Sequence, residues 1–237
     1  MGTLIHNGVR YKGTKRQLEN ITKFDLLQAY NLEDATRMVK ELANAKFDET
    51  IELHYNLNIK QKHSIRDTLV MPHNVGKEVK VLVFAEGEHA TSAKTAGADF
   101  IGSDDLIQKI KGGWFDFDAV VATPDMMPRL AVVASGLGRR KLMPSPKTGN
   151  VTLEIDRVVK EFKAGKIEIR GDKTGNFHIV VGKGSKTEQE LTANILAVHQ
   201  LIIRNKPSDL KGEYIKSLSL TSTMGPSISI DYKKVTV

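Results

Sequence analysis

The sequence predicts an α+β domain built from both chain ends, with a layered α/β domain inserted between them. Strands in the first and last thirds alternate apolar and polar residues, whereas those in the middle third are apolar throughout. The 237 residues suffice for two cores. The charge is also uneven, because residues 74–163 carry 13 basic and 12 acidic residues and the remainder carries 22 and 16.

The first third supplies one helix and one strand. Residues 31–45 begin with Asn31 as a capping side chain and continue with apolar residues at helical spacing. Residues 50–59 alternate strictly, which is typical of a strand with one exposed face in an antiparallel sheet.

The middle third supplies the layered domain. Apolar runs at 79–85 and 118–125 predict buried strands, separated by a helical stretch that ends near residue 97. A loop rich in glycine and proline, 136–150, then leads into a helix at 153–165.

The last third returns to alternation. Two strands flank a turn at residues 172–175, a long helix covers 187–205, and strands follow at 212–220 and 227–237. We therefore assign residues 1–73 and 164–237 to the discontinuous domain and 74–163 to the inserted one. Gly76 and Gly165 lie at the two connections and are the predicted hinge residues.

The composition of the chain limits the classes of function that it can have. The net charge of +7 and the pI near 9.4 favour a polyanionic partner. Cysteine is absent, which excludes disulfides and cysteine-based metal or catalytic sites. No apolar run is long enough for a membrane helix, and the first residues do not resemble a signal peptide. We expect no membrane partner and a location in the cytoplasm or an organelle matrix.

Enzyme motifs are incomplete. The segment 136–141 has a G-x-G without the third glycine of a dinucleotide site, and 182–186 lacks the spacing of a phosphate loop. The histidines show no metal-ligand spacing, and the acidic pairs at 104–105 and 116/118 fit a helix start and a strand entry. We expect no catalytic residue, metal or cofactor. The alternative hypothesis is a nucleotide-binding α/β module or enzyme. A DNA-binding regulator is not favoured, because the sequence contains no motif that enters a DNA groove.

Three loops fit an RNA surface. Residues 45–50 offer Lys46, Phe47 and Thr50, a cation, an aromatic ring and a hydroxyl, although a core position is the simpler interpretation of Phe47. Residues 221–227 are rich in hydroxyls around Met224 and Gly225. The turn at 172–175 adds a cation and a hydroxyl, or is an ordinary hairpin turn.

Several long motifs resemble one known family, the L-one family of the lateral stalk of the large ribosomal subunit. They are KELANAKFDETIELH at 40–54, MPHNVGKEVKVLVFAEG at 71–87, AGADFIG at 96–102, GGWFDFDAVVATPDMM at 112–127, LMPSPKTGNV at 142–151 and TSTMGPS at 221–227. The chain departs from the family pattern at Gly138–Lys141 and at residues 58–67.

The resemblance implies a Rossmann-like inserted domain and a primary ribosomal RNA site on the discontinuous domain. The RNA-binding residues that it implies are Lys46, Phe47, Thr50, Lys173, Thr174, Ser217, Thr223, Met224 and Gly225. It further implies a structural constituent of the large subunit that binds the stalk of large-subunit rRNA and assists release of deacylated tRNA from the exit site. The implied partners include other ribosomal components and the protein's own mRNA, whose translation it would repress. The free protein is expected to be a monomer.

Overall fold

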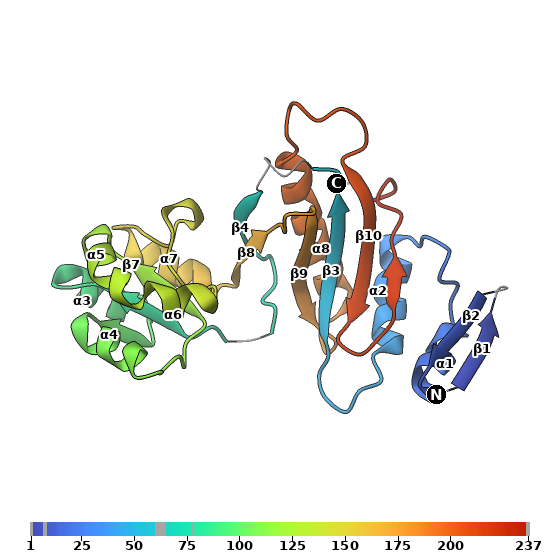
Figure 1. Ribbon diagram of the computed structural model, residues 1–237, viewed down its shortest axis with the longest axis horizontal. Coiled ribbons are helices and arrows are strands. Elements are labelled where there is room, and N and C mark those ends of the chain that lie inside the picture. The colour runs from blue at the N-terminus through green and yellow to red at the C-terminus, as the bar shows by residue number, and fades with distance from the viewer. Residues whose placement is uncertain (1, 7–8, 60–64, 77, 236–237) are drawn as a thin grey trace. The chain divides into compact units, whose positions relative to one another are not determined.

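The computed structural model describes residues 2–6, 9–59, 65–76 and 78–235 (Figure 1). The chain forms two compact units. The terminal unit comprises Met1–Ile65, Pro72–Gly76 and Ile169–Val237, and the inserted unit comprises Arg66–Met71 and Lys77–Glu168. This combination of an α+β unit with a layered α/β unit confirms the predicted fold class.

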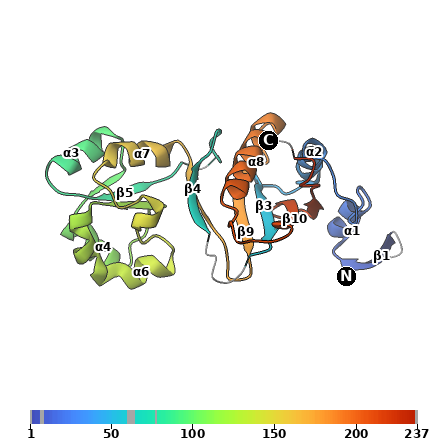
Figure 2. The ribbon, with the colours of Figure 1, turned by 90° about the horizontal axis from the view of Figure 1, so that it is seen from above.

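A four-stranded antiparallel sheet forms the centre of the terminal unit. Its strand order is β11–β10–β3–β9, with bounds Ser227–Ser229 for β11, Ile215–Ser222 for β10, Thr50–Leu57 for β3 and Asn176–Lys183 for β9. Helices α2 (Leu32–Leu42) and α8 (Glu188–Arg204) lie against one face of this sheet (Figure 2). The opposite face carries the polar residues of the alternating strands β3 and β10.

The alternating sequence of β3 explains this arrangement. Ile51, Leu53, Tyr55 and Leu57 are buried, while the residues between them are partly exposed. Because successive side chains of a strand point to opposite faces, one face carries the apolar contacts with the helices and the other keeps polar residues.

The N-terminal segment forms a small substructure of its own. Strands β1 (Gly2–His6) and β2 (Val9–Gly13) pair antiparallel, and helix α1 (Lys15–Ile21) follows. The Thr14 side chain and the Gln17 side chain cap the start of α1 reciprocally, which fixes where the helix begins.

A parallel sheet in the order β6–β5–β7 forms the inserted unit's centre. The strands are β5 (Val81–Phe84), β6 (Phe100–Gly102) and β7 (Ala119–Ala122), and the helices packed on the sheet are α3 (Glu88–Thr95), α4 (Asp104–Lys111), α6 (Ala134–Arg139) and α7 (Ile155–Lys163). Short helical segments lie at Pro124–Met126 (η1), Met127–Leu130 (α5), Ala131–Val133 (η2) and Pro146–Thr148 (η3).

Both faces of this sheet are covered. Leu82 and Phe84 of β5 pack in a core with α4 and α6, while Val81 and Val83 pack in a second core with α3 and α7. Figure 2 shows α3 and α7 on one side of the sheet and α4 and α6 on the other. The three layers explain why these strands are apolar throughout.

Two strands form a separate pair. β4 (Arg66–Val70) pairs with β8 (Lys166–Arg170). The two strands predicted around the turn at 172–175 exist as β8 and β9, but they do not pair with each other, so the alternative of an ordinary hairpin turn is wrong. β9 pairs with β3 instead, because this pairing buries Phe177 and Ile179 beside the apolar residues of β3.

Two further expectations need correction. The segment 136–139, predicted as part of a loop, lies in α6, where Leu137 is fully buried in the core of the inserted unit. The final strand is also shorter than 227–237, since β11 ends at Ser229 and Lys234 donates to the carbonyl of Asp231 in a turn. The acidic pair Asp104 and Asp105 starts α4, as expected.

The chain passes between the units after Ile65, Met71, Gly76 and Glu168, whereas the sequence suggested passages after residues 73 and 163. Both glycines predicted as hinge residues have left-handed backbone, with φ of +99° at Gly76 and +102° at Gly165. A side chain would be strained at either position. Residues 60–64, within the segment that departs from the family pattern, lie outside the described residues.

Candidate nucleic-acid interface

Two loops meet at one end of the terminal unit's sheet. The loop between α2 and β3 contains residues 43–49, and the loop between β10 and β11 contains residues 223–226. Because β3 begins where β10 ends, antiparallel pairing brings the two loops together. Lys46, Phe47, Thr50, Thr223, Met224 and Gly225 all lie at this end, which we call the loop end.

The Glu49 carboxylate joins the two loops. Its side chain is only 2% exposed. One oxygen accepts the Ala45 backbone N–H at 2.9 Å, and the other accepts the Ser222 hydroxyl at 2.8 Å and the Met224 N–H at 2.9 Å. Although burial opposes ionisation, these hydrogen bonds hold the pKa of Glu49 below its usual value. The carboxylate is therefore ionised at neutral pH and fixes both loops.

Thr50 and Thr223 add a second connection. The Thr50 N–H donates to the Thr223 hydroxyl at 2.9 Å, and the Thr223 N–H donates to the Thr50 carbonyl at 3.0 Å. The ammonium of Lys183, at the end of β9, donates to the Thr50 hydroxyl at 2.8 Å. These contacts align the adjacent ends of β3, β9 and β10.

The side chains that project from this frame are exposed. Phe47 is 54% exposed and Met224 is 51% exposed, and Lys46 and Thr223 are also exposed. The core interpretation of Phe47 is therefore wrong. Gly225 has no room for a side chain, because a Cβ there would lie 2.4 Å from the Ser222 hydroxyl oxygen.

The uncovered sheet face extends from the loop end and is polar. Ser217, Ser219 and Thr221 alternate with the buried residues of β10, and the exposed Ser227 and Ser229 lie on β11 beside them. We call this surface the open face. Its hydroxyls can donate to phosphates and exchange hydrogen bonds with ribose 2′-hydroxyls.

Two side-chain pairs join β3 and β9 on the open face. His54 of β3 and His178 of β9 lie opposite each other, with their Nδ1 atoms 2.7 Å apart. Burial and the neighbouring His178 ring lower the pKa of His54. Asn56 donates from its amide to the Asn176 side-chain oxygen at 2.9 Å. Glu52, whose carboxylate lies 3.9 Å from His54 Nε2, adds an acidic group to the same face.

The turn at Asp172–Gly175 lies at the other end of the sheet. Asp172 accepts hydrogen bonds from the backbone and hydroxyl of Thr174 and from the backbone and side chain of Asn176. These bonds, the Thr174 hydroxyl first, lower the pKa of Asp172. Lys173 and Thr174 are exposed on this ordered turn.

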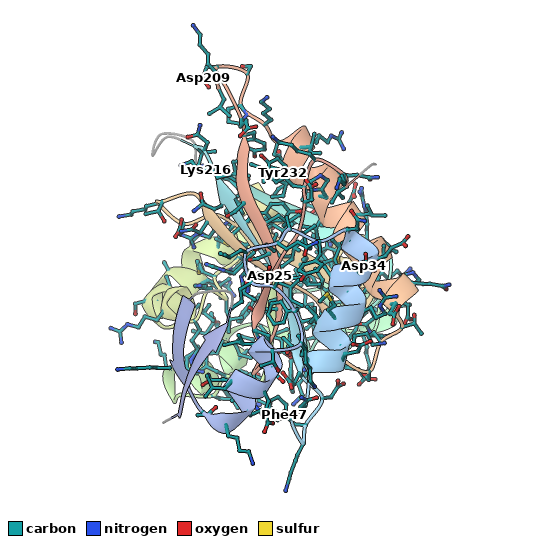
Figure 3. The ribbon with its side chains drawn as sticks, turned by 90° about the vertical axis from the view of Figure 1, so that its right-hand side faces the viewer. Asp25, Asp34, Phe47, Asp209, Lys216 and Tyr232 are labelled. Atoms are coloured by element: carbon teal, nitrogen blue, oxygen red, sulfur yellow. The ribbon has the colours of Figure 1, made fainter. Side chains whose placement is uncertain are left out.

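The predicted site residues therefore form two groups. Ser217 pairs with Asn56, near Lys173 and Thr174, rather than with the loop end. Thr50 and Asn56 are six positions apart on β3, which at 3.3 Å per residue is roughly 20 Å. Phe47 and Lys216, the neighbour of Ser217, accordingly lie at opposite ends of the unit (Figure 3). The open face connects the two groups.

The structure adds residues that the sequence reasoning missed. Glu49 and Lys183 hold the loops, and Glu52, His54, Asn56 and His178 lie on the open face. The open-face residues had a visible signal, because they are the polar members of alternating strands. No comparable signal distinguishes Glu49 from a solvent-exposed acid.

The described residues include no group of three or more side chains suited to hold a metal ion. No helix among them is both long and apolar enough to span a membrane. At the loop end and on the open face, exposed hydroxyls, an aromatic ring and lysines lie above a hydrogen-bonded frame. This arrangement is typical of the class of binding proteins that present an open sheet face.

Comparison with known proteins specifies this class. The family model described as "Ribosomal protein L1p/L10e family" matches residues 39–226. The chain is 46% identical over 227 residues to "Large ribosomal subunit protein uL1" of Kosmotoga olearia, covering 94% of this chain and 98% of that protein. The chain belongs to the ribosomal protein L1p/L10e family, so it has a structural role in the ribosome and is not an enzyme.

Proposed function

We propose that this protein binds the lateral stalk of large-subunit rRNA through the loop end and the open face of its terminal unit. The observation that carries the proposal is the loop end, where Phe47, Met224 and Lys46 project from loops fixed by the buried Glu49 carboxylate. An RNA that meets this surface encounters a fixed geometry. Ordering costs on binding are therefore low.

The chemistry of the surface favours recognition of RNA shape. Hydroxyls and backbone groups contact ribose and phosphate, which an RNA helix displays whatever its sequence. Phe47 and Met224 add apolar contacts with ribose or a base. Lys46 and Lys173 lie at the two ends of the surface, where each can neutralise a phosphate.

The family relationship supports the remaining parts of the proposal. The relative's name places it in the large subunit, and we propose the same location for this chain, beside other ribosomal components. There it moves with the stalk and assists release of deacylated tRNA from the exit site. Gly76 and Gly165 act as hinges in this motion, since both have the positive φ that favours glycine. We also propose that the monomeric free protein represses translation of its own mRNA by binding a stalk-like structure in it.

A binding titration across a salt series tests the rRNA proposal. Wild type, Phe47→Ala and Thr223→Ala are titrated with a stalk rRNA fragment and an unrelated RNA helix. Each variant is expected to weaken stalk binding by about 1–3 kcal/mol with little change in the salt slope, because neither residue is charged. Leu153→Ala and Thr95→Ala are matched controls on exposed residues of the inserted unit.

Two results would contradict the proposal. Equal affinity of wild type for both RNAs would show that binding is merely electrostatic. Selective binding that the controls weaken as much as Phe47→Ala and Thr223→Ala would place the contact elsewhere. A parallel titration with the leader of the protein's own mRNA tests repression, which requires competition between leader and stalk.

A further inference from the structure

A cavity of about 250 Å³ lies beside the loop that carries Met224. Two segments far apart in the sequence form it. Helix α1 and its flanks supply the polar Lys12, Gln17 and Asn20. Ile21, Leu26, Met224 and Pro226 supply apolar atoms.

The N-terminal wall of this cavity is tied to the loop end. The Arg16 guanidinium donates to the Met224 carbonyl at 3.2 Å. Asn20 is only 3% exposed, and its side-chain oxygen accepts from the Asn44 amide at 3.4 Å. Since Asn44 belongs to the same loop as Phe47, α1 contacts both loops of the loop end. The cavity is thus continuous with the surface proposed to bind RNA.

Its size and composition select the occupant. Pockets for whole small ligands usually begin at about 300 Å³, so this cavity suits a single ring system. Apolar atoms next to side-chain amides match a nucleobase, which has flat apolar faces and a polar edge. The exposed Lys12 can neutralise the adjoining phosphate. Among the described lining residues, none is acidic.

We propose that this cavity binds the base of one unpaired nucleotide of the RNA that the open face recognises. The inference rests on the proposed function and deepens it. It extends recognition from the shape of a helix to one base outside that helix. It also gives the N-terminal segment, which precedes the part matched by the family model, a direct role in binding.

A filled cavity tests the proposal. Leu26→Trp places a large ring at a half-buried cavity wall, while Leu27→Trp places it at the next residue, which is 77% exposed and does not line the cavity. Both variants and wild type are titrated with the stalk rRNA fragment. We expect Leu26→Trp to lose about 10-fold in affinity, on the scale of one stacked base, and Leu27→Trp to bind like wild type. Ile21→Trp is a second cavity-filling variant in case Leu26→Trp does not fold.

Single abasic substitutions at each unpaired nucleotide of the fragment identify the bound base. At one position, the abasic substitution is expected to lower the affinity of wild type and Leu27→Trp about 10-fold. The same substitution is expected to leave the affinity of Leu26→Trp unchanged. If Leu26→Trp binds like wild type, or if every abasic position affects all proteins equally, the cavity holds no base. If wild type does not prefer the stalk fragment over an unrelated helix, the proposed function fails, and the inference fails with it.

Discussion

Replacement of Glu49 by glutamine should separate the two loops of the loop end. The carboxylate accepts three hydrogen bonds, from Ala45, Ser222 and Met224. A glutamine oxygen in the position of the second carboxylate oxygen can keep the last two, but its NH₂ group then faces the Ala45 N–H. One charge-assisted bond, about 1.5–3 kcal/mol, is lost, and the other two each weaken by about 1 kcal/mol. We expect a total loss of about 3.5–5 kcal/mol.

Urea unfolding of the terminal unit measures this loss. Its transition is followed separately from that of the inserted unit, because two units need not unfold together. Glu41→Gln, on the exposed side of α2, is the matched control. The pKa of Glu49 is lowered in the folded state, so its contribution is fully present above about pH 4.5 and is lost as the pH falls through the folded value. Wild type should therefore approach the stability of Glu49→Gln in acid.

The stalk affinity of Glu49→Gln provides an independent readout. If the carboxylate orders the loops, affinity falls at pH 7 even where the unit is fully folded, since the loops must be ordered on binding. The reasoning is refuted if Glu49→Gln and Glu41→Gln have the same unfolding free energy. It is also refuted if the difference between wild type and Glu49→Gln stays constant from pH 7 to pH 3.

Three other perturbations test separate parts of the terminal unit. Gly225→Ala brings a Cβ within 2.4 Å of the Ser222 hydroxyl, so we expect about 1–3 kcal/mol of destabilisation in urea and weaker stalk binding; unchanged values would show that the loop adapts. The pKa of His54 is lowered by burial and by the neighbouring imidazole, so its contribution to stability is present above about pH 6.5 and is lost as the pH falls. His54→Gln should flatten this part of a stability–pH profile. An unaltered profile would contradict the lowered pKa of His54. The buried Asn194 accepts from the His73 N–H and donates to the His73 carbonyl, each at 3.0 Å. Asn194→Leu leaves both His73 groups unpaired, and urea unfolding should show a stability loss of about 2–4 kcal/mol. A neutral effect would mean that water replaces the amide.

The sequence was most informative where one periodicity dominates. The alternation in 50–59 predicted both the strand β3 and its exposed face, and the apolar runs of the middle third predicted strands covered on both sides. These patterns report burial directly, because a residue's face follows from its position in the strand. Pairing partners are not encoded in this way. The strands β8 and β9 flank one turn but pair with β4 and β3, because long-range burial decided the partner of β9.

Sequence reasoning about the site succeeded for exposed side chains and failed for the frame beneath them. Phe47 and Met224 were suggested by residue type and loop position, and both are about half exposed. Glu49 was missed, because its role depends on contacts with residues more than 170 positions away. The roughly 20 Å between the two groups of candidate residues was also invisible, since it depends on which strand ends meet.

The two faces of the sheet differ in composition, which explains why a polar binding surface can belong to a stable unit. The helix-covered face of β3 buries Ile51, Leu53, Tyr55 and Leu57, so most of the apolar burial that holds the strands together lies on that face. The open face can therefore carry hydroxyls, amides, imidazoles and the Glu52 carboxylate, which bury less apolar surface. The loop end is different, because its exposed residues depend on Glu49, a buried ion whose loss destabilises the unit. Substitutions on the open face should consequently affect binding more than stability, whereas substitutions beneath the loop end should affect both strongly.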